Sequence, residues 1–432
     1  MKNVTIDVKR VTRVEGHGNI HVDLREGRIA KLELAIVESP RFFESFLRGR
    51  HWSEVPRITC RICGICSVGH TSAAVKAVES ALGIVPSEQT VRLRKLMLYG
   101  EMIQSHVLHL YFLAAPDFLG VGSVIPLAKT HPEVVQRALR MKRLANDICA
   151  VVGGRHIHPI AIQVGGVSHL PEPGELGELR ARLAAAREDL HQTVTLFSSL
   201  EVPDWHRPTE YVSLKDPTEY AFYGGDIVST LDPRPTIPAD YRKRVLEEVV
   251  EHSAAKHCHS PNSSTYAVGA LARFNNNHTQ LHESARAVAA LLGLKAPCSN
   301  PFHNNTAQLV ETVHCVEEAI RLIDDMAARP LVREQPDTPR SFGRGVGAVE
   351  VPRGVLFHEY EFDANGRVAS ANLIIPTGQN LANIEKDMHG LTEHLLAGPV
   401  NKEDLTLKLE MLVRAYDPCI SCATHFLNVT WK

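Results

Sequence analysis

The sequence predicts a mainly α-helical protein with a smaller α+β periphery. Apolar residues recur at three- and four-residue spacing through most of the stretch 71–328, which is typical of packed helices. Strict alternation of apolar and polar residues, which is typical of strands, is confined to residues 4–37 and to a segment near the C-terminus. A central bundle of long helices with small sheets beside it fits this distribution.

The first strands and helices follow from these patterns in chain order. Alternation predicts strands at 4–8, 19–24 and 29–37, with a turn at Glu26-Gly27. Residues 203–238, rich in Pro and Gly, are expected to form loops with short strands. Apolar spacing predicts helices at residues 71–82, 87–113, 132–152, 175–200, 242–256, 279–292 and 306–328.

The C-terminal part combines a hairpin with two helices. Residues 346–362 and 368–375 predict two strands around an Ala-Asn-Gly turn at 364–366. Helices are expected to follow at 383–396 and 403–416. The glycine-rich stretch 343–347 opens no predicted helix, so we interpret it as a loop and not as a dinucleotide-binding turn.

Composition excludes several classes of protein. The chain has 432 residues, 44% of them hydrophobic, and a formal net charge of −2, which gives no basic surface for nucleic acid. No apolar run approaches the ~20 residues that span a bilayer. Residues 1–13 lack the apolar core of a secretory signal, and the nine cysteines are an odd number, so we expect a reducing, cytoplasmic location.

Two Cys-x-x-Cys pairs at opposite ends of the chain are the strongest chemical signal. They are Cys63 with Cys66 and Cys419 with Cys422, and four converging thiolates would hold a soft transition metal. A structural zinc site with four cysteines is the alternative from spacing alone. Zinc motifs, however, are local in sequence, whereas these pairs are separated by most of the chain. Four further cysteines stand alone and are expected to be buried apolar residues: Cys149, Cys258, Cys298 and Cys315.

The residues around the two pairs resemble the signature motifs of the [NiFe]-hydrogenase large subunit. The resemblance extends along the whole chain through six motifs in the family's order. They are residues 13–17 (Arg-Val-Glu-Gly-His), 61–66 (Arg-Ile-Cys-Gly-Ile-Cys) with His70, 105–109 with Asp117, 154–166, 352–354 (Pro-Arg-Gly) and 417–425 (Asp-Pro-Cys-Ile-Ser-Cys-Ala-Thr-His). The resemblance implies the fold of that subunit, with N-terminal β-hairpin elements beside the helix bundle.

The same resemblance implies the metal ligands. Cys63 and Cys419 would be terminal ligands of nickel, while Cys66 and Cys422 would bridge nickel and iron. The iron would carry carbon monoxide and cyanide, which the sequence does not supply. A position left open between the metals would make this a catalytic and not a structural site.

Heterolytic cleavage of hydrogen also needs a base, and the resemblance suggests its identity. Cys419 or the guanidine of Arg353 would take the proton, and Glu15 would carry it onward, because a buried carboxylate can exchange protons near neutrality. Asp117 would pair with Arg353 and orient it. His70 would donate a hydrogen bond to the Cys66 sulfur. In isolation, a solvated charge would be the favoured interpretation of Glu15 and a surface residue that of Arg353, while Asp117 could be a turn former and His70 a core histidine.

A second metal site is implied near the C-terminus. The family binds Mg²⁺ or a similar ion, and the matching ligands here are Glu44, the backbone carbonyl of Leu381 and His425, with oxygen donors that suit Mg²⁺. Family members are commonly cleaved after this histidine. We therefore expect residues 1–425 to form a single catalytic large-subunit domain and residues 426–432 to be a processing peptide, removed by a maturation endopeptidase after nickel-insertion proteins have acted.

Three segments are most similar to the cytoplasmic bidirectional, sulfhydrogenase type of enzyme, which couples hydrogen to NAD(P). They are residues 41–44, 250–259 and 375–380. The resemblance implies an iron–sulfur small subunit and diaphorase subunits that bind flavin and NAD(P). A hydrogen-sensing subunit and a metal-free quinone-site subunit, similar to that of complex I, remain as alternative functions.

Overall fold

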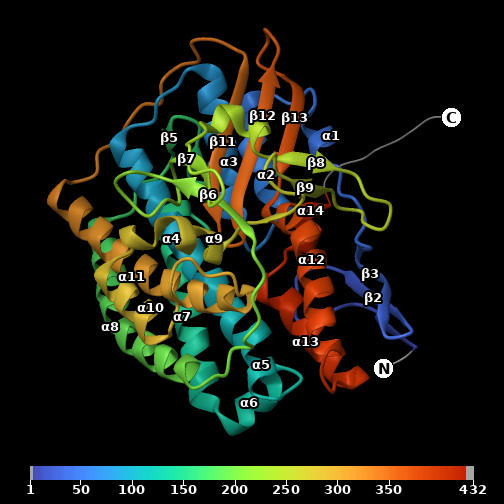
Figure 1. Cartoon of the computed structure of the whole chain (residues 1–432). Helices are drawn as coiled ribbons and strands as arrows, with labels where there is room; N and C mark the ends of the chain where they lie inside the picture. The colour runs from blue at the N-terminus through green and yellow to red at the C-terminus, as the bar shows by residue number, and fades with distance from the viewer. Residues whose placement is uncertain (1–2, 425–432) are drawn as a thin grey trace.

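Long helices form the body of the molecule, and small sheets lie around them (Figure 1). The structure is a computed structural model that describes residues 3–424. Its helices are α1 Phe43–Leu47, α2 Val55–Thr59, α3 Ser67–Leu82, α4 Glu88–Leu108, α5 Ala115–Phe118, α6 Val124–Thr130, α7 Pro132–Gly153, α8 Pro173–Ser198, α9 Ala270–Asn277, α10 Glu283–Leu291, α11 Asn304–Ala328, α12 Pro376–Leu396, α13 Lys402–Ala415 and α14 Ile420–Ala423.

Between residues 3 and 424 the strands form five small sheets. Two three-stranded antiparallel sheets have the orders β1-β2-β3 and β11-β12-β13; a third, β10-β6-β7, is mixed. Two-stranded pairs are β4-β5 and β8-β9. The strands are β1 Val4–Val8, β2 Gly18–Arg25, β3 Arg28–Ile36, β4 Ile162–Gln163, β5 Gly166–Val167, β6 Glu210–Lys215, β7 Asp226–Ser229, β8 Leu246–Glu248, β9 His257–His259, β10 Tyr266–Ala267, β11 Arg344–Val351, β12 Gly354–Phe362 and β13 Val368–Ile374.

The helix bundle was predicted correctly in its main members. Helix α4 packs against α7 and α11, and α8 covers α7 and α11 on the lower left of Figure 1. The predicted helix 87–113 begins as expected, because Ser87 caps α4 by accepting a hydrogen bond from the Thr90 backbone N–H at 3.0 Å. Its last part is a π-helix, His109–Ala114. Within residues 3–424, no helix is long and apolar enough to cross a membrane.

The predicted helix 242–256 is wrong. This segment instead continues from a 3-10 helix, Pro238–Lys243, into the β8-β9 hairpin. Ser253 gives a physical reason, because its hydroxyl donates to the Ala255 carbonyl at 2.8 Å and accepts from the Ala255 N–H at 3.1 Å. Such local bonds compete with helical ones. The Ala254 N–H then donates to the Ile36 carbonyl of β3, which holds the segment in an extended path.

The glycine-rich stretch 343–347 is not a loop over most of its length, because β11 begins at Arg344. Helix α3 packs directly on this strand. A Cβ atom on Gly347 would lie 2.1 Å from the Ala73 carbonyl oxygen, and one on Gly345 would lie 2.1 Å from that of Ala77. The two glycines therefore serve the close approach of a helix to a strand, a use that a sequence pattern alone does not reveal.

Both ends of the described chain pack on one core. The main hydrophobic cluster includes Ile6 of β1 and Ala423 of α14, together with residues of the long helices. Helix α12 contributes to this arrangement along its whole length and begins at Pro376, seven residues before the predicted start. Proline at the first helical position explains the earlier start. The fold thereby places the two Cys-x-x-Cys segments beside each other.

Candidate metal centre

The structure brings the four predicted ligands together. One sulfur from each of Cys63, Cys66, Cys419 and Cys422 lies within 4.8 Å of the others, and all four residues are buried. The first pair lies directly before α3, and the second pair lies in and before α14. The sulfurs of Cys63 and Cys419 are 3.7 Å apart, and Cys419 and Cys422 are paired as a disulfide. Cys60, three residues before Cys63, is not part of the cluster.

The protein tunes the two sulfurs of the first pair in opposite directions. A hydrogen bond from the Cys66 thiol, the positive charge of Arg353, and the N–H groups of Ile65 and Cys66 together lower the pKa of Cys63 to about 7, against the effect of burial. The hydrogen bond to Cys63 and burial raise the pKa of Cys66 well above its usual value. One thiolate is thus available near neutral pH before any metal binds.

Glu15 lies against the second cysteine pair. One oxygen of its carboxylate lies 3.2 Å from the Cys419 sulfur and accepts a hydrogen bond from the Ser421 N–H at 3.0 Å, and the Ser421 hydroxyl also donates to this carboxylate. Glu15 and Cys419 form a parallel β-bridge, so this contact is built on the backbone. Gly16 permits it: its φ is +85°, and a Cβ there would lie 2.8 Å from the Ser421 nitrogen.

Arg353 also lies at the centre, but its predicted partner is wrong. Its guanidinium donates to the Asp417 carboxylate at 2.8 Å and to the Asp417 backbone carbonyl, and it does not pair with Asp117 in the structure. Burial lowers the pKa of Arg353, but its attraction to Asp417 and to the sulfurs of Cys66 and Cys63 outweighs this effect and raises the pKa overall. Asp417 lies two residues before Cys419, so the segment that places the second cysteine pair also places this carboxylate beside Arg353.

Asp117 has a different set of partners. Its carboxylate accepts two hydrogen bonds from Arg414, at 2.6 and 2.8 Å, and one from Arg13. Both arginines come from segments that flank the centre, residue 13 just before Glu15 and residue 414 in α13. Asp117 therefore joins the N-terminal segment to α13 and does not touch the cysteines directly.

Two buried side chains, one histidine and one glutamate, lie at the start of α3, directly after the first cysteine pair. His70, in the first turns of α3, has its Nδ1 3.1 Å from Nε2 of His358, whose Nδ1 is 2.6 Å from the hydroxyl of Tyr360. The predicted bond to the Cys66 sulfur stays a prediction. Glu101 of α4, which sequence reasoning missed, accepts from the N–H groups of Val68 and Gly69 at 2.7 and 2.9 Å. Burial raises its pKa well above the usual value.

The predicted cation site can be located only in part. The Glu44 carboxylate, in α1, accepts a hydrogen bond from the Leu373 N–H at 2.9 Å. Three residues earlier, the Arg41 N–H donates to the carbonyl of Thr424 at 2.7 Å, so this segment lies beside the end of the described chain. Leu381 is buried inside α12, where its carbonyl belongs to the helical ladder. His425 and residues 426–432 lie outside the described residues.

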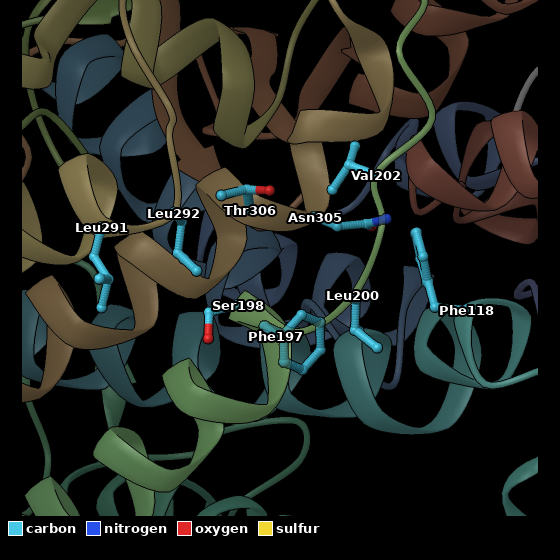
Figure 2. Close-up of a pocket in the computed structure, with 9 residues that line it drawn as sticks. All are labelled: Phe118, Phe197, Ser198, Leu200, Val202, Leu291, Leu292, Asn305 and Thr306. Carbon is cyan, nitrogen blue, oxygen red and sulfur yellow. The ribbon is translucent and has the colours of Figure 1, made fainter.

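An apolar cavity of about 110 Å³ lies elsewhere, between α5, α8 and α11. Figure 2 shows its lining, with Phe197 and Leu200 facing Leu292 and Asn305. It contains no ionisable side chain and none of the predicted site residues. This cavity is therefore separate from the cysteine cluster, where four sulfurs, the half-buried carboxylate of Glu15 and the buried guanidinium of Arg353 come together.

The donor set fits a soft transition metal centre. Four buried sulfurs at metal-binding separation suit nickel, iron or zinc. The surrounding charges favour a reactive centre over a closed zinc site, because a carboxylate contacts one sulfur and a guanidinium lowers the pKa of another. The fold and this site define a metalloenzyme whose centre is built from both ends of its chain.

Comparison with known proteins identifies the family. The model of the nickel-dependent hydrogenase family matches residues 41–138 and 258–425, and a HoxL-like model matches residues 5–38. The chain is 35% identical to the sulfhydrogenase 1 alpha subunit of Pyrococcus furiosus over 99% of this chain and 100% of that protein. For the sulfhydrogenase 2 alpha subunit of the same organism, identity is 33% over 98% and 100%. This chain belongs to the nickel-dependent hydrogenase family.

Solved structures agree with this assignment. An NAD⁺-reducing [NiFe]-hydrogenase in the H₂-reduced state matches with a TM-score of 0.89 and 28% identity, over 98% of this chain and 100% of that one. A Ni-Fe-Se hydrogenase from D. vulgaris Hildenborough has the same fold at a TM-score of 0.80 and 23% identity, over 98% and 100%. The predicted large-subunit fold and the predicted enzyme class, a hydrogenase, are confirmed.

Proposed function

We propose that Cys63, Cys66, Cys419 and Cys422 hold the nickel–iron centre of this hydrogenase, with Cys63 and Cys419 as terminal ligands of nickel and the other two as bridges to iron. The single observation that carries the proposal is the convergence of their buried sulfurs within 4.8 Å. Metal binding needs thiolates, so the Cys419–Cys422 pair is reduced in the loaded protein. The iron would also carry carbon monoxide and cyanide as ligands.

The bound centre would supply the two-electron chemistry of H₂ cleavage, which yields two protons and two electrons. The chain's own residues would handle the protons. The Cys419 sulfur takes up the first proton, and Glu15 receives it from Cys419 across a contact of 3.2 Å. Arg353, the other base that the sequence suggested, is bonded to Asp417 as a guanidinium with a raised pKa, so its charge acts on the site without taking up a proton. Asp417 positions Arg353 through the bond at 2.8 Å. Asp117 acts as a positioning residue through Arg13 and Arg414.

The electrons would leave through partner subunits. We propose an iron–sulfur small subunit and, beyond it, a flavin module that exchanges electrons with NAD(P), as a sulfhydrogenase-type complex in the cytoplasm. The support is the similarity to sulfhydrogenase alpha subunits and to an NAD⁺-reducing hydrogenase. Hydrogen-dependent reduction of NAD⁺ or NADP⁺ by the complete complex tests this link. Activity with an artificial acceptor alone would contradict it and leave the metal centre in place.

Metal content tests the ligand assignment. Replacing any one of the four cysteines by serine should remove nickel from the purified chain, since serine is a poor donor for soft metals. Cys60→Ser is the matched control: it lies three residues from Cys63 and is also buried, but it is outside the cluster. Nickel retained in Cys63→Ser, or lost equally in Cys60→Ser, would contradict the assignment.

Maturation and the magnesium site belong to the same proposal. Glu44, the Leu381 carbonyl and His425 would bind Mg²⁺, and an endopeptidase would remove residues 426–432 after nickel-insertion proteins have loaded the centre. The Arg41–Thr424 bond supports this by holding the segment of Glu44 beside Thr424, the residue directly before His425. Intact-mass measurement should give a nickel-loaded chain that ends at His425. A nickel-loaded chain that still ends at Lys432 would contradict it.

A further inference from the structure

A second cluster of metal-binding side chains lies apart from the cysteines. It consists of His252, in the loop between β8 and β9, His257, the first residue of β9, and Glu385 in the middle of α12. One ring nitrogen of each histidine and one carboxylate oxygen all lie within 4.8 Å of one another. In Figure 1 the β8-β9 hairpin lies beside the upper end of α12. The cluster therefore joins two elements that are far apart in the sequence.

His257 has an unexplained polar atom in this cluster. The residue is only 6% exposed, and its buried Nε2 has no hydrogen-bond partner among residues 3–424. A buried polar nitrogen without a partner is energetically unfavourable, so the arrangement needs a physical reason. An imidazole nitrogen with a lone pair is a common metal ligand, so an ion bound here would supply the missing partner.

The other two groups are held in position and reach solvent. Oxygen Oε1 of Glu385 is 2.7 Å from Nε2 of His252 and accepts a bond from the Leu34 N–H at 2.8 Å. That backbone bond orients the carboxylate, as outer-shell bonds do in metal sites. The side chains of His252 and Glu385 are 25% and 19% exposed, so an ion can enter from one side. The nearby Lys256 is neutralised by Glu247 at 3.2 Å.

We propose that His252, His257 and Glu385 form a binding site for a divalent transition-metal ion, with Zn²⁺ as its ligand. Two imidazoles and one carboxylate, with solvent at the fourth position, are a donor set that zinc takes in tetrahedral sites. Bonds of about 2.0–2.1 Å would hold these donors about 3.3 Å apart. The His252–Glu385 hydrogen bond would open, and the imidazole would keep its proton on the ring nitrogen that does not bind the ion.

This site is independent of the proposed hydrogenase centre. It shares no residue with the cysteine cluster or with the cation site proposed at Glu44, and it ties β9 to α12. The first turn of α12 carries Thr377, whose hydroxyl accepts from the Cys419 N–H at 2.9 Å. Zinc at the new site would therefore stabilise the position of α12, the helix that contacts the second cysteine pair through Thr377.

Zinc uptake by the purified full chain tests the proposal. The wild-type chain should take up about one more equivalent of Zn²⁺ than His257→Gln, and zinc should raise the melting temperature of the wild type but not that of His257→Gln. His259→Gln is the matched control, because it lies in the same strand outside the cluster and should behave as the wild type. Glu385→Gln is a second, partly exposed variant that should also lose the ion and can still accept from Leu34.

Cobalt spectroscopy separates this site from the cysteines. Co²⁺ bound by nitrogen and oxygen should give visible d–d bands that disappear in His257→Gln, without the thiolate-to-cobalt charge transfer of a cysteine site. Equal zinc uptake in the wild type, His257→Gln and Glu385→Gln would overturn the proposal. Cobalt bands that always carry thiolate charge transfer would also overturn it. Neither result would bear on whether the cysteines hold nickel and iron, because that is read from metal content in the cysteine variants.

Discussion

Burial decides what individual charges can do around the cysteines. Arg353 is 4% exposed and Asp417 is 2% exposed, so their bond forms in a medium of low dielectric. Removing one partner of such a pair leaves an uncompensated buried charge. Family resemblance predicted that Arg353 would be held by a carboxylate, but it selected the wrong aspartate. Two carboxylates from different segments can satisfy the same motif, and only the folded backbone distinguishes them.

Arg353→Lys tests the positioning of this charge. Lysine keeps the positive charge but cannot make the forked contact with Asp417, so the charge moves relative to the sulfurs. We expect hydrogen turnover to fall about 10- to 100-fold with nickel and iron content unchanged. Turnover with an artificial electron acceptor, together with metal analysis, measures this. Unchanged turnover in the metal-loaded variant would contradict the role given to Arg353.

Glu15→Gln tests the proton path. Glutamine keeps the size of the side chain and can still accept a bond from the Ser421 N–H, but it cannot carry a proton. We expect turnover to fall about 10²- to 10⁴-fold while the infrared spectrum of the centre stays the same. Glu38→Gln, at an acid that pairs with His17 away from the sulfurs, should leave turnover intact. If both variants behave alike, the path does not run through Glu15.

At the scale of elements, β11 and α3 lie so close together that only glycine fits at two positions of the strand. Gly345 and Gly347 leave room for the backbone of α3, which begins immediately after Cys66. The sequence predicted the long helices because their periodicity is local. Local periodicity gave the wrong structure for residues 242–256 and 343–347. The Ala254 N–H bonds to the Ile36 carbonyl of β3, and the glycines of β11 meet α3, and both contacts form only in the folded chain.

Gly347→Ala should destabilise the protein strongly. The new methyl group would meet the Ala73 carbonyl oxygen at 2.1 Å, and backbone atoms cannot move aside as a flexible side chain can. We expect a loss of about 3 kcal/mol or more in the free energy of unfolding. Chemical denaturation measures it. Gly343→Ala is the control, because a Cβ there meets nothing within 4 Å, and a similar loss in that variant would refute the steric explanation.

At the scale of the whole molecule, neutral buried histidines make stability depend on pH. Burial lowers the pKa of His314 to about 4, below the value of about 6.5 in an unfolded chain. Between pH 6.5 and 4, the His314 ring therefore binds a proton in the unfolded state but stays neutral in the folded state. This contribution to stability is complete above pH 6.5 and is lost as the pH falls toward 4.

We expect His314→Gln to weaken that dependence. The unfolding free energy of the wild type should drop between pH 6.5 and 4 by about 3 kcal/mol more than that of the variant. Denaturation at several pH values on samples of equal metal content measures the difference. His389→Gln, at a half-exposed histidine on α12, should keep the wild-type slope. If His314→Gln keeps it too, this ring does not contribute.

The sequence predicted those parts of the site that lie in family motifs, and it did not predict those that depend on packing of distant elements. The two cysteine pairs and Glu15 could be assigned to one centre from their motifs, because family motifs preserve what the fold brings together. Glu101 and the cluster of His252, His257 and Glu385 carry no local pattern of that kind. They acquire their surroundings only when α4, α12 and the β8-β9 hairpin pack in place.

The central claim is that the four cysteines hold a nickel–iron centre, and infrared spectroscopy of the purified protein tests it most directly. Carbon monoxide and cyanide bound to iron absorb in a region where protein groups do not, and metal analysis of the same sample gives the ratio of nickel to iron. The account predicts these bands, with nickel and iron in equal amounts, and their loss in Cys422→Ser but not in Cys60→Ser. Zinc alone in the cysteine site, with no such bands, would contradict it.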